Sequence, residues 1–168
     1  MFEFADFLVD QFQNYQPKVV ISHSFGSVNV AKVLRQIPEL KVKLWVMITT
    51  PFDFKSRIDQ MVDFFKLKKK VRKNLVNKIE EDTNERIENL NMATYCREIC
   101  NVEKGLIVHS KEDNVLPIEG ARKVNEAFAQ SEMVELEDYG HYSILWSKEL
   151  KQILAEQLGK QKQVNQYF

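Results

Sequence analysis

The feature that most constrains this chain is the alternation of short β-branched runs with segments of helical periodicity. The runs lie at 18–22, 44–48, 105–109 and 133–136. Helical spacing of apolar residues follows these runs at 25–36, 118–129 and 143–158. Such alternation predicts a mainly parallel sheet with right-handed crossovers and helices on both faces. We therefore expect a three-layer α/β fold, in which the strand at 18–22 is buried on both of its faces.

Three further segments complete the predicted domain organisation. Residues 2–14 have helical spacing and are closed by Pro17, so they predict an N-terminal helix. Residues 54–100 contain helical periodicity and no strand pattern, which predicts a helical insertion between the second and third strands. The expected organisation is one domain over 1–158, followed by a flexible tail at 159–168 that is rich in Lys and Gln.

Charge and composition exclude several classes of partner. The formal net charge is zero, so no long-range electric field favours binding of nucleic acid or of an acidic substrate. Hydrophobic residues make up 44% of the chain, which is enough to form a core. The basic run from Lys66 to Lys73 has two interpretations, a polyanion site or a solvated helix face balanced by the acidic residues downstream, and neutrality favours the second. No cofactor and no metal is expected, and no nucleic-acid partner.

The expected location is the cytoplasm. The N-terminus has acidic residues and no basic segment typical of a secretory signal, and no apolar run approaches the ~20 residues needed to span a bilayer. Cys96 and Cys100 lie four apart in a segment that predicts a helix. They provide no disulfide framework, and buried helix cysteines are favoured over a zinc site because a second ligand pair is missing.

The most informative stretch follows the first predicted strand. It reads Ser22-His23-Ser24-Phe25-Gly26 and places Ser24 on a tight turn between a strand and a helix. A serine at such an elbow has a strained backbone and an exposed hydroxyl, and bulky residues two positions before or after it would collide. The N-terminus of the next helix directs its dipole to the same place, where negative charge on an acyl oxygen would be stabilised.

This stretch resembles the nucleophile motif of the α/β-hydrolase family, Gly-x-Ser-x-Gly, with Ser22 at the first glycine position. The resemblance implies a chain order of Ser, acid and His, with the partners on loops after later strands. Asp113, shortly before Pro117, is similar to the family's acid loop, and Gly140-His141 is similar to its histidine loop. The implied triad is Ser24, Asp113 and His141, with the backbone N–H of Phe25 as an oxyanion donor.

Other residues are alternatives for single roles. Glu112 is an alternative to Asp113 as the carboxylate that orients the histidine. His23 and His109 also lie at strand ends. We interpret His23 as the variable position of the motif and His109 as a packing residue, since neither has the neighbouring ligands of a metal site.

The resemblance also implies how this chain differs from the family. The family's sheet usually has eight strands, and this chain supplies the last four. The loop that carries the second oxyanion donor is then missing, at a cost of about 2.7–4 kcal/mol of transition-state stabilisation. The strand at 18–22 is left as an apolar sheet edge. We expect a homodimer, or a separate polypeptide, to cover that edge.

The sequence therefore predicts a serine hydrolase that acts on a small-molecule carboxylic ester, thioester or related acyl bond. The helices at 54–100 are expected to form a lid over an apolar acyl pocket, with Phe64, Phe65 and Leu67 as candidate lining residues. The alternative is a shortened, non-catalytic binding or assembly module that retains the triad. Labelling by a fluorophosphonate probe distinguishes the two, because it requires a working Ser–His pair.

Overall fold

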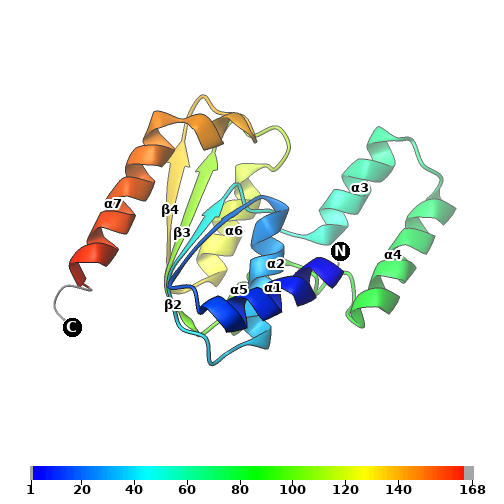
Figure 1. The fold of residues 1–168 in the computed structure, drawn as a ribbon. Coiled ribbons are helices and arrows are strands. Elements are labelled where there is room, and N and C mark those ends of the chain that lie inside the picture. The colour runs from blue at the N-terminus through cyan, green and yellow to red at the C-terminus, as the bar shows by residue number, and fades with distance from the viewer. Residues whose placement is uncertain (1, 165–168) are drawn as a thin grey trace.

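The computed structural model describes residues 2–164, with side chains over 5–159. Its four strands form one parallel sheet in the order β1-β2-β3-β4: β1 Val19–His23, β2 Val42–Ile48, β3 Val102–Ser110 and β4 Ser131–Leu136. Helices α1 Phe2–Tyr15, α2 Phe25–Gln36, α5 Met92–Glu98 and α6 Ile118–Ala127 lie on one side of the sheet, and α7 Lys148–Val164 lies on the other (Figure 1). The predicted three-layer α/β fold is confirmed.

Three strands begin earlier than the sequence predicted. The predicted starts were 44, 105 and 133, whereas β2, β3 and β4 begin at Val42, Val102 and Ser131. Polar residues interrupt the apolar runs there, yet the backbone still pairs: Leu44 lies opposite Lys104 in the ladder. Lys104 places its ammonium 2.7 Å from Glu132 at the sheet margin. Backbone pairing thus continues where the side chains reach solvent.

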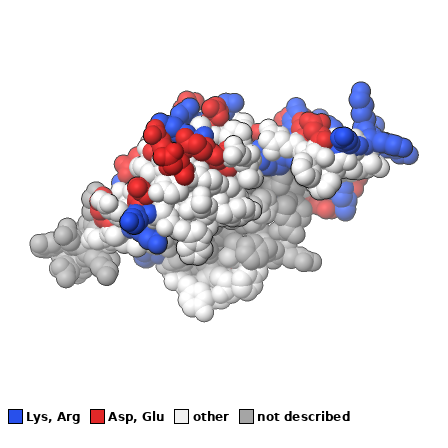
Figure 2. Space-filling model, turned by 90° about the horizontal axis from the view of Figure 1, so that it is seen from above, with Lys and Arg blue, Asp and Glu red and all other residues white. Residues whose placement is uncertain are grey.

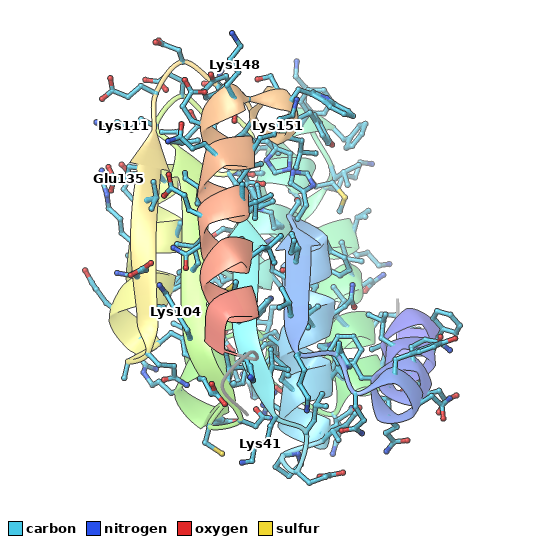
Figure 3. The ribbon with its side chains drawn as sticks, turned by 60° about the vertical axis from the view of Figure 1, so that its left-hand side comes forward. Lys41, Lys104, Lys111, Glu135, Lys148 and Lys151 are labelled. Carbon is cyan, nitrogen blue, oxygen red and sulfur yellow. The ribbon has the colours of Figure 1, made fainter. Side chains whose placement is uncertain are left out.

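The prediction that the first strand is buried on both faces was wrong. Val20 and Ser22 are buried, but Ile21 on the opposite face is 47% exposed. β1 is an edge strand of the sheet as described, and the core beneath α7 is built from β2, β3 and β4 residues. Figure 3 shows α7 crossing in front of these strands and leaving β1 uncovered beside it. One helix is too narrow to cover all four strands.

Charged side chains lie along the margin of the sheet at β3 and β4 and on the outer side of α7. Figure 3 shows Lys104, Lys111 and Glu135 along β3 and β4, and Lys148 and Lys151 on α7. Lys111 lies 2.5 Å from Glu137, and Glu135 accepts two hydrogen bonds from Arg122. Exposed pairs of this kind contribute little stability. They mark the margin of the sheet, where side chains reach solvent on both of its faces.

The predicted insertion at 54–100 divides into two parts. Helices α3 Phe54–Phe64 and α4 Lys69–Thr83 form an arm that projects from the body (Figure 1). α4 buries no residue, and Arg72 of the basic run is paired with Asp59 of α3 at 2.6 Å. By contrast, α5 packs on α2 and α6 and belongs to the core. The basic run thus lies in the turn before α4 and on the exposed start of that helix.

The two cysteines have different surroundings. Cys96 lies in α5 and is buried, and burial raises the pKa of its thiol to about 12. Cys100 is exposed and follows the end of α5 at Glu98, so the prediction of two buried helix cysteines holds only for Cys96.

The C-terminal helix also differs from its predicted bounds of 143–158. A short 3₁₀ turn, η1 Ser143–Trp146, precedes α7, and Ser147 separates them by accepting the N–H of Leu150 with its hydroxyl, as a helix cap does. α7 continues to Val164. Residues 165–168 of the predicted tail lie outside the described residues.

Gly105 provides the sharpest packing constraint in the sheet. A Cβ at this position would lie 2.6 Å from Cε1 of Phe128, whose ring packs edgewise on Trp45. Gly105→Ala is therefore expected to lower the free energy of unfolding by about 1–3 kcal/mol, because the buried ring must shift. Urea denaturation measures this change. Gly159→Ala in α7 is the control: nothing lies within 4 Å of its added Cβ, so helix propensity should stabilise that variant slightly. Equal effects would contradict the packing argument.

Candidate active site

Ser24 is the single residue between β1 and α2. Its backbone has φ 52° and ψ −126°, a region that costs a non-glycine residue about 1–3 kcal/mol. Two backbone hydrogen bonds hold it there: Ser24 donates its N–H to the carbonyl of Ile48 at 2.9 Å, and its own carbonyl accepts the N–H of Ser27 at 3.0 Å. The strained elbow is thus fixed between the neighbouring strand and the first turn of α2.

The serine at the first glycine position of the motif fits without crowding. The Ser22 hydroxyl donates to the carbonyl of Val46 at 3.2 Å, accepts from Nε1 of Trp45 at 2.9 Å, and lies 3.0 Å from the Ser27 hydroxyl. A Cβ at Gly26 would lie 4.0 Å from Cβ of Ser22, which is ordinary contact. The two positions can therefore hold small side chains, and Ser22 links the elbow to β2.

Asp113 lies in the loop after β3 and is buried. Its Oδ1 accepts the backbone N–H groups of Val115 at 2.8 Å and Leu116 at 2.9 Å. Its Oδ2 lies 2.8 Å from Nδ1 of His141. The two carboxylate oxygens thus face two backbone N–H groups and one imidazole nitrogen. The loop thus presents a fixed negative oxygen to the histidine.

His141 follows β4 and lies between Asp113 and Ser24. Its Nε2 is 2.9 Å from Oγ of Ser24. Because an ionised carboxylate only accepts, Nδ1 must carry the proton, which leaves a lone pair on Nε2 for the serine hydroxyl. The structure therefore brings the three residues of the predicted triad into one hydrogen-bonded chain at the carboxyl ends of β1, β3 and β4.

Glu112, the alternative carboxylate, has a different position. Its Oε2 accepts the backbone N–H of Asp138 at 2.7 Å and the hydroxyl of Ser110 at 3.1 Å. The Ser110 hydroxyl also accepts the N–H of Tyr139. Glu112 thus ties the acid loop to the segment that leads into His141, and the structure does not bring it to the imidazole.

The other two histidines both contact the chain of hydrogen bonds. His23 places Nε2 3.0 Å from the backbone carbonyl of His141, so it donates there and holds the histidine loop. His109 is buried, donates Nε2–H to the carbonyl of Leu116 at 2.8 Å, and lies 3.6 Å from Oδ2 of Asp113. Burial lowers the pKa of His109, against the opposing effects of the Leu116 carbonyl and Asp113, and so favours a neutral ring. The packing role predicted for His109 thus includes support of the acid loop.

An apolar pocket of about 110 Å³ begins beside the elbow. Its wall contains the side chains Phe25, Val28, Pro51, Phe52, Phe54, Leu90, Met92 and Tyr95, together with Asp53, Arg57 and Asn91. The rings of Phe25 and Phe54 meet edge to face at 5.8 Å between centroids, which joins α2 to α3. The pocket thus lies between α2, the helix that follows Ser24, and α3, the first helix of the arm.

The three substrate-lid candidates are not among the residues of this pocket. Phe64 is the last residue of α3 and Phe65 is its C-cap. Their rings pack on each other and are 80% and 63% exposed, and Leu67 follows in the turn to α4. That turn is the outer end of the projecting arm (Figure 1). Sequence reasoning missed the opposite end of α3, where Phe54 and Arg57 line the pocket, because the helical period does not reveal which end of a helix faces the body.

The backbone N–H of Phe25 lies at the expected oxyanion position, directly after Ser24. Phe25 is the first residue of α2, and the N–H groups of a helix's first turn have no partner within the helix. The dipole of the twelve-residue α2 adds partial positive charge at this end. The arrangement can accept a proton from Ser24 and stabilise negative charge next to it.

The surroundings of the site carry few charges. Figure 2 looks onto the carboxyl ends of the strands; acidic side chains gather on the side away from the arm with basic ones beside them, other basic side chains lie at the end of the arm, and the middle of the face is largely uncharged. None of the helices within residues 2–164 is long and apolar enough to cross a membrane.

Comparison with known proteins gives a consistent result. The family model for serine hydrolases matches residues 3–145. The fold is similar to that of an α/β hydrolase from a sediment metagenome of the Mar Chica lagoon in Morocco, with 20% identity, a TM-score of 0.65, and coverage of 95% of this chain and 70% of that one. No curated protein matches.

Two further solved structures have the same fold. One, from Nitrososphaera gargenis, belongs to a study of carboxylesterases; it shares 17% identity and a TM-score of 0.62 over 94% of this chain and 71% of that one. The other is an α/β hydrolase from a Medee basin deep-sea metagenome, with 15% identity and a TM-score of 0.62 over 92% and 69%. At these identities the likeness concerns the fold alone. With the family model covering most of its length, this chain belongs to the serine hydrolase family and has the α/β-hydrolase fold.

Proposed function

We propose that this protein hydrolyses a carboxylic ester, thioester or related acyl bond through Ser24, His141 and Asp113. The observation that carries the proposal is the 2.9 Å distance between Oγ of Ser24 and Nε2 of His141, because a nucleophile and its base must lie within hydrogen-bond reach. Membership of the serine hydrolase family supports hydrolase activity.

In the proposed reaction, His141 takes the Ser24 proton as Oγ attacks the carbonyl carbon. The negative charge then moves to the carbonyl oxygen, beside the Phe25 N–H and the N-terminus of α2. Collapse of this intermediate breaks the acyl bond, and the His141 imidazolium protonates the leaving group. Water, deprotonated by His141, then hydrolyses the acyl-enzyme and regenerates Ser24. Asp113 keeps the proton on Nδ1 of His141 and stabilises the imidazolium.

A fluorophosphonate probe and hydrolysis of p-nitrophenyl esters test this function. We expect covalent labelling and ester turnover, with the backbone N–H of Phe25 as an oxyanion donor. Neither labelling nor turnover would contradict the proposal and favour a non-catalytic binding or assembly module. The cytoplasmic location and the lid role of the arm stay predictions.

We further propose that the purified chain covers the β1 edge by pairing with a second copy or a separate polypeptide. Within the described residues β1 pairs with β2 alone, and Ile21 is half exposed beside that free edge. Open apolar edges favour pairing with another strand. Sedimentation equilibrium at micromolar concentration should give twice the monomer mass for the isolated chain. A strictly monomeric chain whose β1 amides exchange slowly would contradict self-association.

A further inference from the structure

The outer end of the arm carries large apolar side chains that stay exposed. Phe64 and Phe65 pack on each other with 5.0 Å between their ring centroids, and Val71 in the first turn of α4 is also exposed. Exposed apolar side chains that are grouped in this way mark an interaction site, whereas single ones do not. We call these three residues the arm tip, together with the exposed lysines next to them in the sequence, Lys66, Lys68, Lys69, Lys70 and Lys73.

The charges of the arm are separated along its length. Residues 59–73 contain six basic and two acidic side chains, whereas residues 74–88 contain two basic and five acidic ones, so their net charges are +4 and −3. Lys69 and Glu80 of α4 lie about 16 Å apart along the helix axis, which is about twice the Debye length at physiological ionic strength. The neutrality of the whole chain therefore does not neutralise the arm tip.

The acidic side chains at the inner end of the arm have partners of their own. Glu85 lies 3.8 Å from Arg35 of α2, and Glu80 accepts the backbone N–H of Ile87 at 2.8 Å. By contrast, none of the five lysine ammonium groups of the arm tip has a hydrogen-bond or ion-pair partner among the side chains described over 5–159. These lysines are available to an anionic surface outside the chain.

Helix stability does not explain this placement of lysines. Lys69 and Lys70 stand in the first turn of α4, which has no acidic residue, and cations at that end of a helix oppose its dipole. Lys68 is the N-cap and makes no side-chain capping hydrogen bond, and α4 buries no residue. The lysines thus neither cap the helix nor pack it on the body.

From these observations we infer that the arm tip binds the surface of an anionic lipid bilayer. The lysines would contact lipid headgroups, while Phe64 and Phe65 would enter the boundary between headgroups and acyl chains. Figure 2 shows basic side chains at the end of the arm that project away from the body, a shape that suits a flat surface. Single-stranded nucleic acid suits the rings poorly, because at 88° to each other they offer no parallel faces to successive bases.

Co-sedimentation with lipid vesicles tests this inference. The protein should bind vesicles of phosphatidylcholine that contain about 30% phosphatidylserine, bind pure phosphatidylcholine at least about 10-fold more weakly, and dissociate as the ionic strength rises to about 0.5 M. Lys66→Gln/Lys69→Gln/Lys70→Gln should weaken binding about 100-fold, because each lysine contributes about five-fold. Phe64→Ser/Phe65→Ser should weaken it at least about 10-fold through loss of apolar contact, at low and at high salt alike.

The matched control removes three exposed lysines outside the arm. Lys41→Gln/Lys148→Gln/Lys151→Gln makes the same change in net charge and should bind the vesicles as the wild-type protein does. Equal weakening by the two triple variants would show that total charge drives binding and would overturn the inference. Circular dichroism verifies that the variants are folded, which is expected because every replaced side chain is exposed.

Three other results would also overturn the inference. The first is no binding to phosphatidylserine vesicles, and the second is binding of oligouridylate by the arm tip without binding of vesicles. The third is a lower mass of Phe64→Ser/Phe65→Ser at sedimentation equilibrium, which would make the tip a contact between copies of the chain. Ser24→Ala should bind vesicles like the wild-type protein, so failure of the proposed hydrolase function leaves this test unaffected.

Discussion

Replacing Ser24 with alanine is expected to abolish fluorophosphonate labelling and to lower kcat/KM for p-nitrophenyl esters by about 10⁴-fold or more. The change removes the attacking oxygen and therefore the acyl-enzyme route. Among the residues that the structure describes, the half-buried Ser24 side chain has His141 as its one hydrogen-bond partner, so removal of its hydroxyl should leave the fold intact. Probe labelling on a denaturing gel and the initial rate of ester hydrolysis measure the two effects.

Ser27→Ala is the matched control for this variant. Ser27 lies one turn into α2, is buried, and contacts the Ser22 hydroxyl at 3.0 Å, so its loss affects the support of the elbow and not the attacking group. Labelling should persist in Ser27→Ala. Labelling that also persisted in Ser24→Ala would place the nucleophile elsewhere and remove the basis of the proposed function.

Asp113→Asn is expected to lower kcat/KM by about 10⁴-fold with little loss of structure. The amide oxygen of asparagine can still accept the N–H groups of Val115 and Leu116, as Oδ1 of Asp113 does. Its NH₂ group then faces Nδ1 of His141, which must act as an acceptor and move its proton to Nε2. In that tautomer Nε2 donates to Ser24 and can no longer take its proton.

The control for this prediction is Glu112→Gln. Glu112 contacts Ser110 and Asp138 instead of His141, so the neutral variant should retain most of the ester hydrolysis rate. Initial rates of the two variants, together with their thermal unfolding midpoints, separate the roles. Equal losses of activity in both would show that loop structure, not the His141 tautomer, limits the reaction.

Much of the candidate site could be predicted from the sequence because its parts are local. The elbow at Ser24 combines a buried strand, a tight turn and a helix within a few residues, and each leaves a pattern in the sequence. Asp113 and His141 lie directly after strands, and parallel strands bring their carboxyl ends to one edge of the sheet. The resemblance to the α/β-hydrolase family, together with the position of these residues after predicted strands, therefore predicted that Ser24, Asp113 and His141 would lie together, while their catalytic roles stay predictions.

The contacts between distant segments could not be predicted in this way. The bond from His23 to the carbonyl of His141 joins residues 118 positions apart, and Arg57 reaches Val115 across 58 positions. From the sequence, neither His23 nor Arg57 can be distinguished from a polar residue whose side chain is exposed to solvent. The sequence pattern describes what a segment prefers, whereas these contacts depend on how two loops and a helix meet.

The sequence by itself thus determined the order of strands and helices, the parallel sheet and the position of the elbow, because apolar periodicity reports which side of a segment is buried. Only the tertiary structure decided which face of β1 is covered, that α5 belongs to the core while α3 and α4 project, and that the pocket uses Phe54 instead of Phe64. The physical reason is that burial of a whole face depends on the width of the helix layer above it. No single segment encodes that width.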